Sequence, residues 1–197
     1  MKALLALVFA VTSIGASAQD KPKTETFDIV PSESKITYVG KKVTGQHTGN
    51  VDIKNGNLVF KGDLLVGGEI TADMNTITST DLTEKEWNDK FTTHMKSADF
   101  FNVEKHPETK VVIKNSKKTK KGLEVNGDLT MVGTTKPITF IVTNLKKSGD
   151  SVTAKTDLKL NRTLWGLKYG SGSFFKGLGD KAIDDEFTLS VEIKAKK

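Results

Sequence analysis

Apolar and polar residues alternate along most of this chain from Phe27 onward. A long row runs from Leu64 to Met74, where apolar residues or glycine occupy every second position. Such alternation is typical of a β-strand with one apolar face and one face in water. Other rows occupy 36–38, 51–53, 123–131 and 187–193. The pattern therefore predicts a mainly antiparallel β protein.

Turn sequences separate several of these rows. Asn55-Gly56 is a strong signal for a hairpin between two alternating rows. We also expect turns at 120–122 and 148–150, which lie between other pairs of rows. Asn126-Gly127 differs because the alternation continues through it, which indicates a bulge or bend inside one long strand.

One segment breaks the alternation and has a helical period instead. Thr83 followed by Glu86 matches a capping box. Three large apolar residues then recur at a spacing of four: Trp87, Phe91 and Met95. This spacing predicts one short amphipathic helix over about 84–95, in a connection between strands. Phe100 and Phe101 follow it directly.

Long one-sided strands must cover their apolar faces with a second sheet or by closing on themselves. The rows give about eight or nine strands, and a barrel of about eight is just wide enough to hold a small elongated ligand. Periodicity alone leaves the barrel and the two-sheet sandwich both open. No internal repeat or long linker interrupts 27–197, so we expect a single domain there.

The first eighteen residues have the order of a secretory signal peptide. Met1-Lys2 is a short basic start, residues 3–11 are an apolar run, and Ala16-Ser17-Ala18 is a small-residue cleavage site. The apolar run is too short for a membrane span. We therefore expect cleavage near Ala18, a mobile lead-in over 19–26, and a periplasmic or secreted mature protein.

Charge and cysteine content argue against several classes of protein. The formal net charge is +6, yet Arg162 is the only arginine. Proteins that read nucleic acids use arginine for bidentate contacts, so we expect no nucleic-acid partner. Lysine clusters, such as 117–121 and 194–197, indicate a solvated surface, with weak attraction to an anionic membrane surface as the alternative. The chain has no cysteine, which excludes disulfides and thiol nucleophiles.

Few residues suggest an enzyme. No pair among His47, His94 and His106 has the one-turn spacing of a helical zinc site, so we expect surface or turn positions and no metal. No Gly-x-Ser-x-Gly elbow occurs, and the glycine-rich segment 170–180 lacks the lysine-serine ending of a phosphate loop. We therefore expect no catalysis. A redox or hydrolytic enzyme and an envelope interaction or stress module without ligand are the alternatives.

Several stretches carry more specific motifs. They are MKSADFFNVEKHPET (95–109), GDLTMVGTTKPI (127–138), LNRTLWGL (160–167), GKKVTGQHTGNVDIKNG (40–56) and GGEITADMNTI (67–77). The most specific parts are Ser97 to Phe101 with Pro107 behind them, and 127–130 with Gly133 and Thr135-Lys136. In this order they resemble the YceI-like family of exported bacterial proteins.

This resemblance implies an extended, lipocalin-like antiparallel barrel in the periplasm. Its apolar interior would bind the tail of an isoprenoid or a similar long-chain amphiphile. The expected function is therefore to carry or store a polyprenyl lipid or isoprenoid quinone, with no other cofactor. The sequence does not fix which lipid is bound, nor the oligomeric state, for which a dimer is one option.

Candidate ligand-binding residues are those that we expect to face the lumen or its mouth. They are Leu64, Val66, Ile70, Met74, Phe100, Phe101, Leu129, Met131, Phe140, Val142, Trp165, Phe174, Phe175, Phe187, Leu189 and Val191. We expect one of Phe100 and Phe101 to pack beneath the helix beside Trp87 and Phe91 while the other contacts ligand. The alternative is that both belong to the core.

Three further positions have two interpretations each. Trp165 belongs to the barrel wall or rim, or faces the ligand. Phe174-Phe175 lies in a glycine-rich loop and provides apolar contacts at the barrel mouth. Arg162 either recognises a polar head group or pairs with an acid such as Asp184 or Asp185.

Overall fold

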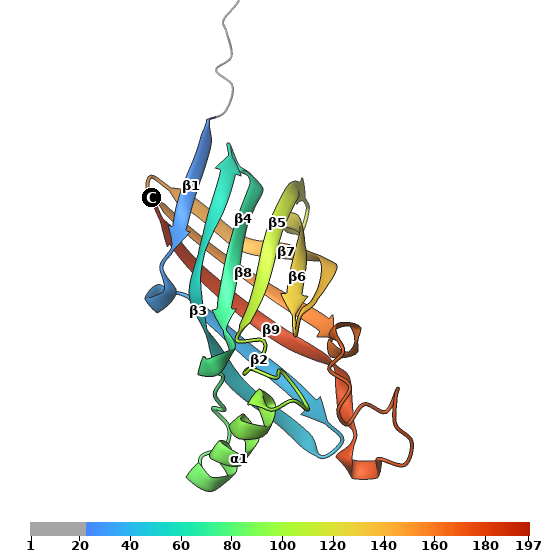
Figure 1. Ribbon diagram of the computed structural model, residues 1–197. Coiled ribbons are helices and arrows are strands. Elements are labelled where there is room, and N and C mark those ends of the chain that lie inside the picture. The colour runs from blue at the N-terminus through green and yellow to red at the C-terminus, as the bar shows by residue number, and fades with distance from the viewer. Residues whose placement is uncertain (1–22) are drawn as a thin grey trace, which may run out of the picture.

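The structure is a computed structural model that describes residues 23–197. Nine antiparallel strands form one sheet that closes into a barrel (Figure 1). The strands are β1 (Thr24–Ile29), β2 (Lys35–Lys42), β3 (Gly45–Lys61), β4 (Leu64–Asp73), β5 (Glu108–Thr119), β6 (Gly122–Met131), β7 (Thr134–Ser148), β8 (Ser151–Asn161) and β9 (Ile183–Lys196). The expected signal peptide, 1–18, lies outside the described residues.

Eight strand positions surround the barrel because β1 and β2 share one position. Both lie between β3 and β9, with β1 beside 57–61 of β3 and β2 beside 45–51. The sheet order is β1-β3-β2-β9-β8-β7-β6-β5-β4, and the pairing of β3 with β4 closes it. The barrel of about eight strands that the sequence predicts is confirmed.

The hairpin predicted at Asn55-Gly56 is wrong. Both residues lie inside β3, and the chain turns only after Lys61, at residues 62–63. Lys54 has no partner on β4, so the register shifts there and the glycine follows a bulge. A Cβ on Gly56 would lie 2.5 Å from the carbonyl oxygen of Glu69, so the glycine allows close backbone approach.

Two predicted turns are confirmed, whereas two other expectations are modified. The chain turns at 120–121 and 149–150. Asn126-Gly127 lies inside β6, and the bulge is in the neighbouring strand β5, where Lys114 is skipped between Ile113 and Asn115. Thr24 to Thr26, expected in a mobile lead-in, instead belong to β1.

The predicted helix is α1 (Lys85–Lys96). Its N-cap is Glu84, which makes no side-chain cap, so the predicted capping box does not form. Instead the side-chain amide of Asn88 donates to the carbonyl oxygens of Ser79 and Leu82, at 2.9 and 2.8 Å, and ties the first turn to the preceding segment. Among residues 23–197 no helix is long and apolar enough to cross a membrane.

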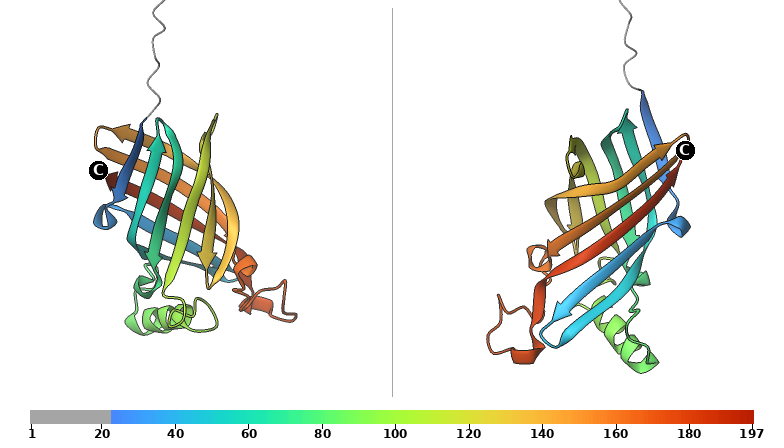
Figure 2. Two further views of the ribbon diagram at one scale, coloured as in Figure 1. Left: turned by 45° about the horizontal axis from the view of Figure 1, so that its top comes forward. Right: turned by 180° about the vertical axis from the view of Figure 1, so that it is seen from behind.

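Four short 3-10 helices lie in connections: η1 (Pro31–Glu33), η2 (Met74–Thr76), η3 (Arg162–Trp165) and η4 (Gly179–Lys181). Figure 2 shows α1 and the segment between β8 and β9 at one end of the barrel, which we call the mouth end. The start of β1 and the C-terminus lie at the other, which we call the closed end.

Side chains fill the interior at the closed end. Phe27 and Phe60 are 0% and 1% exposed and pack edge to face, with ring centroids 5.8 Å apart. Glu25 pairs with Lys147 and Lys197 beside these rings. The ion pairs anchor β1 over the apolar core.

Candidate functional site

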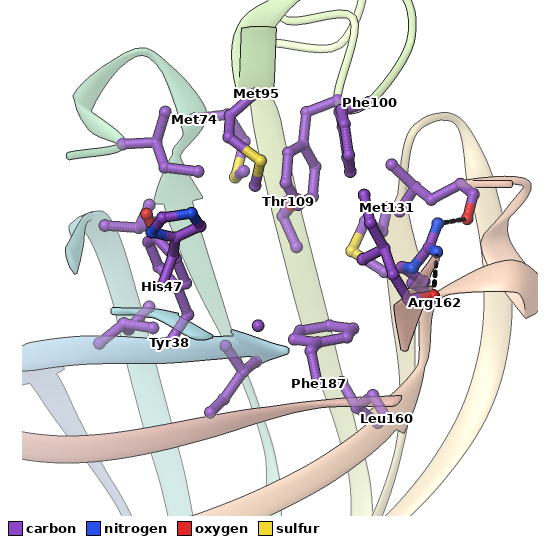
Figure 3. A pocket seen from close by; sticks show the side chains of 18 of the residues that line it. Tyr38, His47, Met74, Met95, Phe100, Thr109, Met131, Leu160, Arg162 and Phe187 are labelled. Carbon is purple, nitrogen blue, oxygen red and sulfur yellow. Dashed lines mark hydrogen bonds between the residues drawn. The ribbon is translucent and has the colours of Figure 1, made fainter. Parts of the chain in front are cut away.

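A cavity of about 190 Å³ occupies the part of the barrel interior near the mouth end. It is lined by strands β2 to β6, β8 and β9, by α1, and by the segments that follow β4, α1 and β8. Figure 3 shows Tyr38, His47, Met95, Phe100 and Phe187 around it. Strands supply the walls, and the connections supply the end.

A second cavity of about 130 Å³ continues toward the closed end. Six residues line both cavities: Ile36, Ala72, Thr109, Leu129, Leu160 and Leu189. The two cavities are therefore successive sections of one lumen.

The deeper section is lined almost wholly by apolar side chains. Among the described residues, its polar lining consists of Thr109, Lys155 and Thr156. The Thr156 hydroxyl donates to the Ile141 carbonyl oxygen at 2.9 Å, so that polar group is already satisfied. Such a wall suits a hydrocarbon chain, which forms no hydrogen bonds and gains about 0.8 kcal/mol for each buried methylene.

Most of the predicted lumen residues line these cavities. The first section contains Met74, Phe100, Phe101, Leu129, Met131, Phe187 and Leu189. The second contains Ile70, Leu129, Phe140, Val142, Leu189 and Val191. Whether they contact a ligand stays a prediction.

Leu64 and Val66 do not face the lumen, and that prediction is wrong. They are 37% and 38% exposed, whereas Leu65 between them is buried and lines the deeper section. Val66 has no partner on β3, so the register shifts there. A shift by one residue exchanges the inward and outward faces, which explains why the alternation at 64–66 does not match that of the rest of β4.

The structure also places Trp165 and the Phe174-Phe175 pair. Trp165 is 2% exposed, and its indole N–H donates to the Leu129 carbonyl oxygen at 3.0 Å. It lies outside the cavity lining and belongs to the barrel wall. Phe174 and Phe175 are about half exposed and line neither cavity section.

Phe100 and Phe101 both line the cavity, so which of them contacts ligand stays a prediction. Phe101 packs against the apolar cluster that includes Phe91, as expected for a residue beneath α1. Phe100 packs against the ring of Tyr169, with centroids 5.3 Å apart. Trp87, expected beside them, is 54% exposed and does not belong to this cluster.

Arg162 lies in the cavity wall with its guanidinium directed at backbone carbonyls (Figure 3). Nη1 donates to Leu167 at 2.6 Å, Nε to Asp184 at 3.0 Å and Nη2 to Ile183 at 3.1 Å. The Asp185 carboxylate, one of the two expected acids, lies 3.7 Å from Nη2. Burial lowers the pKa of Arg162, although the nearby acids act in the opposite direction. These contacts tie both ends of the β8–β9 segment together, and the head-group role stays a prediction.

The structure also pairs His47 with Asp81 at the mouth, which the sequence analysis did not find. Their Nδ1 and Oδ2 atoms are 2.8 Å apart, and the imidazole packs 4.6 Å from the Phe91 ring. Burial would raise the pKa of Asp81, but the Thr48 N–H, the His47 ring and the Ser79 hydroxyl lower it overall. An ionised Asp81 favours a proton on the Nδ1 that faces it.

The separation of His47 and Asp81 explains why the pair escaped detection. They are 34 residues apart, on β3 and in the segment before α1, with no motif that joins them. Among residues 23–197, no group of three or more His, Cys, Asp or Glu residues is placed to hold a metal ion.

Residues 27–195 match the YceI-like domain family. A UPF0312 protein of Pseudomonas putida strain GB-1 is 53% identical over 51 residues, which cover 25% of this chain and 27% of that protein. Protein YceI of Escherichia coli O17:K52:H18 is 35% identical over 86 residues, covering 44% of this chain and 42% of the relative. A UPF0312 protein of Photorhabdus laumondii is 32% identical over 100 residues, 50% of each chain. The matched segments thus span between about a quarter and half of these relatives.

Two solved structures share the fold over most of the chain. BcnA of Burkholderia cenocepacia aligns with a TM-score of 0.63 and 20% identity, covering 85% of this chain and 99% of that one. A polyisoprenoid-binding domain from Saccharophagus degradans, implicated in plant cell wall breakdown, aligns with a TM-score of 0.64 and 13% identity, covering 86% and 97%. At these identities the likeness shows a common fold.

Proposed function

The chain belongs to the YceI-like domain family, and from that premise we propose that it binds a long-chain isoprenoid-type lipid in its lumen and carries or stores it in the cell envelope. The observation that carries the proposal is the continuous apolar lumen formed by the two cavity sections. The fold neighbour from Saccharophagus degradans is described as polyisoprenoid-binding, which supports the same ligand class. The envelope location rests on the signal sequence expected at 1–18.

An apolar lumen supplies enough free energy for this task. Burial of ten methylene-sized units contributes about 8 kcal/mol before ordering costs, which corresponds to roughly micromolar affinity. The polar end of the lipid would lie at the mouth, where His47 and Arg162 line the cavity. The lumen is suited to holding a chain, so we propose a carrier and not an enzyme.

The test is to narrow the lumen where its two sections meet. Ala72 is buried there and lines both sections. We expect Ala72→Phe to weaken binding of a polyprenol of ten isoprene units by at least about tenfold, because displacing two methylene units costs about 1.6 kcal/mol. Isothermal titration calorimetry would measure the dissociation constant.

Val66→Phe is the matched control, because it adds a ring to the same strand at an exposed position. It should bind the polyprenol as the unchanged protein does. Thermal unfolding would verify that both variants are folded. Equal affinity of the folded Ala72→Phe variant and the control would contradict a lumen site.

A further inference from the structure

Exposed apolar side chains gather at the mouth end. Six large apolar residues are between 45% and 64% exposed, and we call them the mouth patch: Val43, Trp87, Leu164, Tyr169, Phe174 and Phe175. They come from the turn between β2 and β3, from α1 and from the β8–β9 segment. Figures 1 and 2 show these three segments around the same end of the barrel. The other exposed large apolar residues, Leu64, Val66 and Val112, lie on strands of the barrel.

Single exposed apolar residues are normal on protein surfaces, but a gathering of them marks an interaction site. Four of the six are aromatic, including one tryptophan and one tyrosine. Tryptophan and tyrosine concentrate where proteins meet the boundary between lipid and water. The composition of the mouth patch therefore favours a bilayer surface.

Several lysines beside the mouth patch make no ion pair with a carboxylate. Lys41 and Lys42 lie at the end of β2, and Lys168, Lys176 and Lys181 lie between β8 and β9. None of these five belongs to an ion pair among residues 23–197. Other lysines of the same end do pair with carboxylates, Lys85 with Asp89 and Lys159 with Glu186, so only part of the positive charge there is free. Two lysines of the mouth end instead lie over patch rings, Lys168 over Phe174 and Lys90 over Trp87. These charges are available to anionic lipid head groups.

The mouth patch borders the lumen. Lys41, Lys42 and Leu167 line the outer cavity section beside the patch segments. Tyr169 packs against Phe100 and His94, with ring centroids 5.3 and 4.7 Å apart, and so connects the patch to the cavity wall. A surface bound here would face the opening of the lumen.

We propose that the mouth patch and its lysines dock the protein on an anionic phospholipid bilayer. The patch residues lie on a turn, a helix and a loop that can each enter the head-group region to a shallow depth, and their aromatic rings with the neighbouring lysines match an anionic bilayer surface. Docking would let a lipid tail pass between bilayer and lumen without crossing water. The docking itself needs no lipid inside the barrel.

Cosedimentation with vesicles tests the proposal. The full chain should bind vesicles of phosphatidylglycerol mixed with phosphatidylcholine, bind pure phosphatidylcholine vesicles at least about tenfold more weakly, and lose affinity as salt screens the lysines. The variant Trp87→Ser/Phe174→Ser/Phe175→Ser should bind at least about tenfold more weakly, since it removes three inserted rings. Val66→Ser/Val112→Ser, which alters exposed residues of the barrel wall, should bind unchanged.

Tryptophan fluorescence gives an independent readout. The chain has two tryptophans, and Trp165 is buried whereas Trp87 is 54% exposed. Vesicles should shift the emission to shorter wavelength, and the shift should vanish in Trp87→Phe. Absence of vesicle binding, or equal loss in the mouth and wall variants, would overturn the proposal. Ala72→Phe should still bind vesicles, so failure of lumen binding and failure of docking are distinguishable.

Discussion

Gly49 on β3 pairs with Tyr38 on β2 and has no room for a side chain. A Cβ there would lie 1.8 Å from the Thr78 carbonyl oxygen and 2.4 Å from the Tyr38 hydroxyl oxygen. That hydroxyl donates to the same Thr78 carbonyl at 2.7 Å. Burial raises the pKa of Tyr38, so the phenol stays neutral and remains a donor. One glycine thus permits the contact that joins β2 to the segment before α1.

Gly49→Ala should therefore lower the free energy of unfolding by about 2–3 kcal/mol, through steric overlap and loss of the Tyr38 hydrogen bond. Urea denaturation at neutral pH would measure the change. Gly40→Ala is the control, because nothing lies within 4 Å of a Cβ at that position of β2. A similar small effect of both substitutions would show that the close approach at Gly49 has no energetic role.

At the residue scale, sequence reasoning succeeded where a strand kept its alternation. Ile70 and Met74 line the lumen as predicted. The prediction that Leu64 faces the lumen was wrong because the bulge at Val66 reverses which residues face inward. Composition does not reveal a bulge. The His47–Asp81 contact depends on chain segments meeting across the mouth, which periodicity does not encode.

At the element scale, an ion-pair cluster adds to the backbone pairing and apolar burial that hold β1. Hydrogen bonds from Lys147 and Lys197 lower the pKa of Glu25 to about 2, from an ordinary value of 4.5. A carboxyl group whose pKa falls on folding stabilises the protein above its unfolded pKa. Its contribution is lost as the pH drops from 4.5 toward 2.

The unfolding free energy of Glu25→Gln should consequently fall below that of the unchanged protein near pH 7. This difference should shrink as the pH falls from about 4.5 toward about 2, because the carboxylate becomes protonated. Chemical denaturation across this pH range would measure it. The control, Glu104→Gln, alters an acid without an ion pair among residues 23–197 and should leave the pH profile close to that of the unchanged protein. A constant difference for Glu25→Gln at every pH would contradict the ion-pair account.

Helix α1 was predictable because its signal lies within one short stretch of sequence. The spacing of Trp87, Phe91 and Met95 located α1 to within one residue at each end, even though its N-cap is not the predicted one. The hairpin predicted at Asn55-Gly56 was wrong because the pairing of β3 with β4 overrides the local turn preference. The glycine serves backbone approach and not reversal.

At the scale of the whole molecule, closure of the barrel is a non-local property. Periodicity shows that strands need a cover but not whether a second sheet or β3–β4 pairing provides it, so the family motifs decided between the alternatives. The lumen likewise depends on register around all strands. Side chains fill the closed end around Phe27 and Phe60, whereas the mouth end keeps a cavity of about 190 Å³.

Native mass spectrometry of the freshly purified protein tests the lumen proposal most directly. The account predicts a complex of one chain with one long-chain lipid, which collisional activation releases as an isoprenoid-type species. It also predicts that Ala72→Phe, but not Val66→Phe, yields mainly the bare chain. Bare chain alone for the unchanged protein, even after incubation with a polyprenol of ten isoprene units, would contradict the claim that this barrel is a lipid carrier.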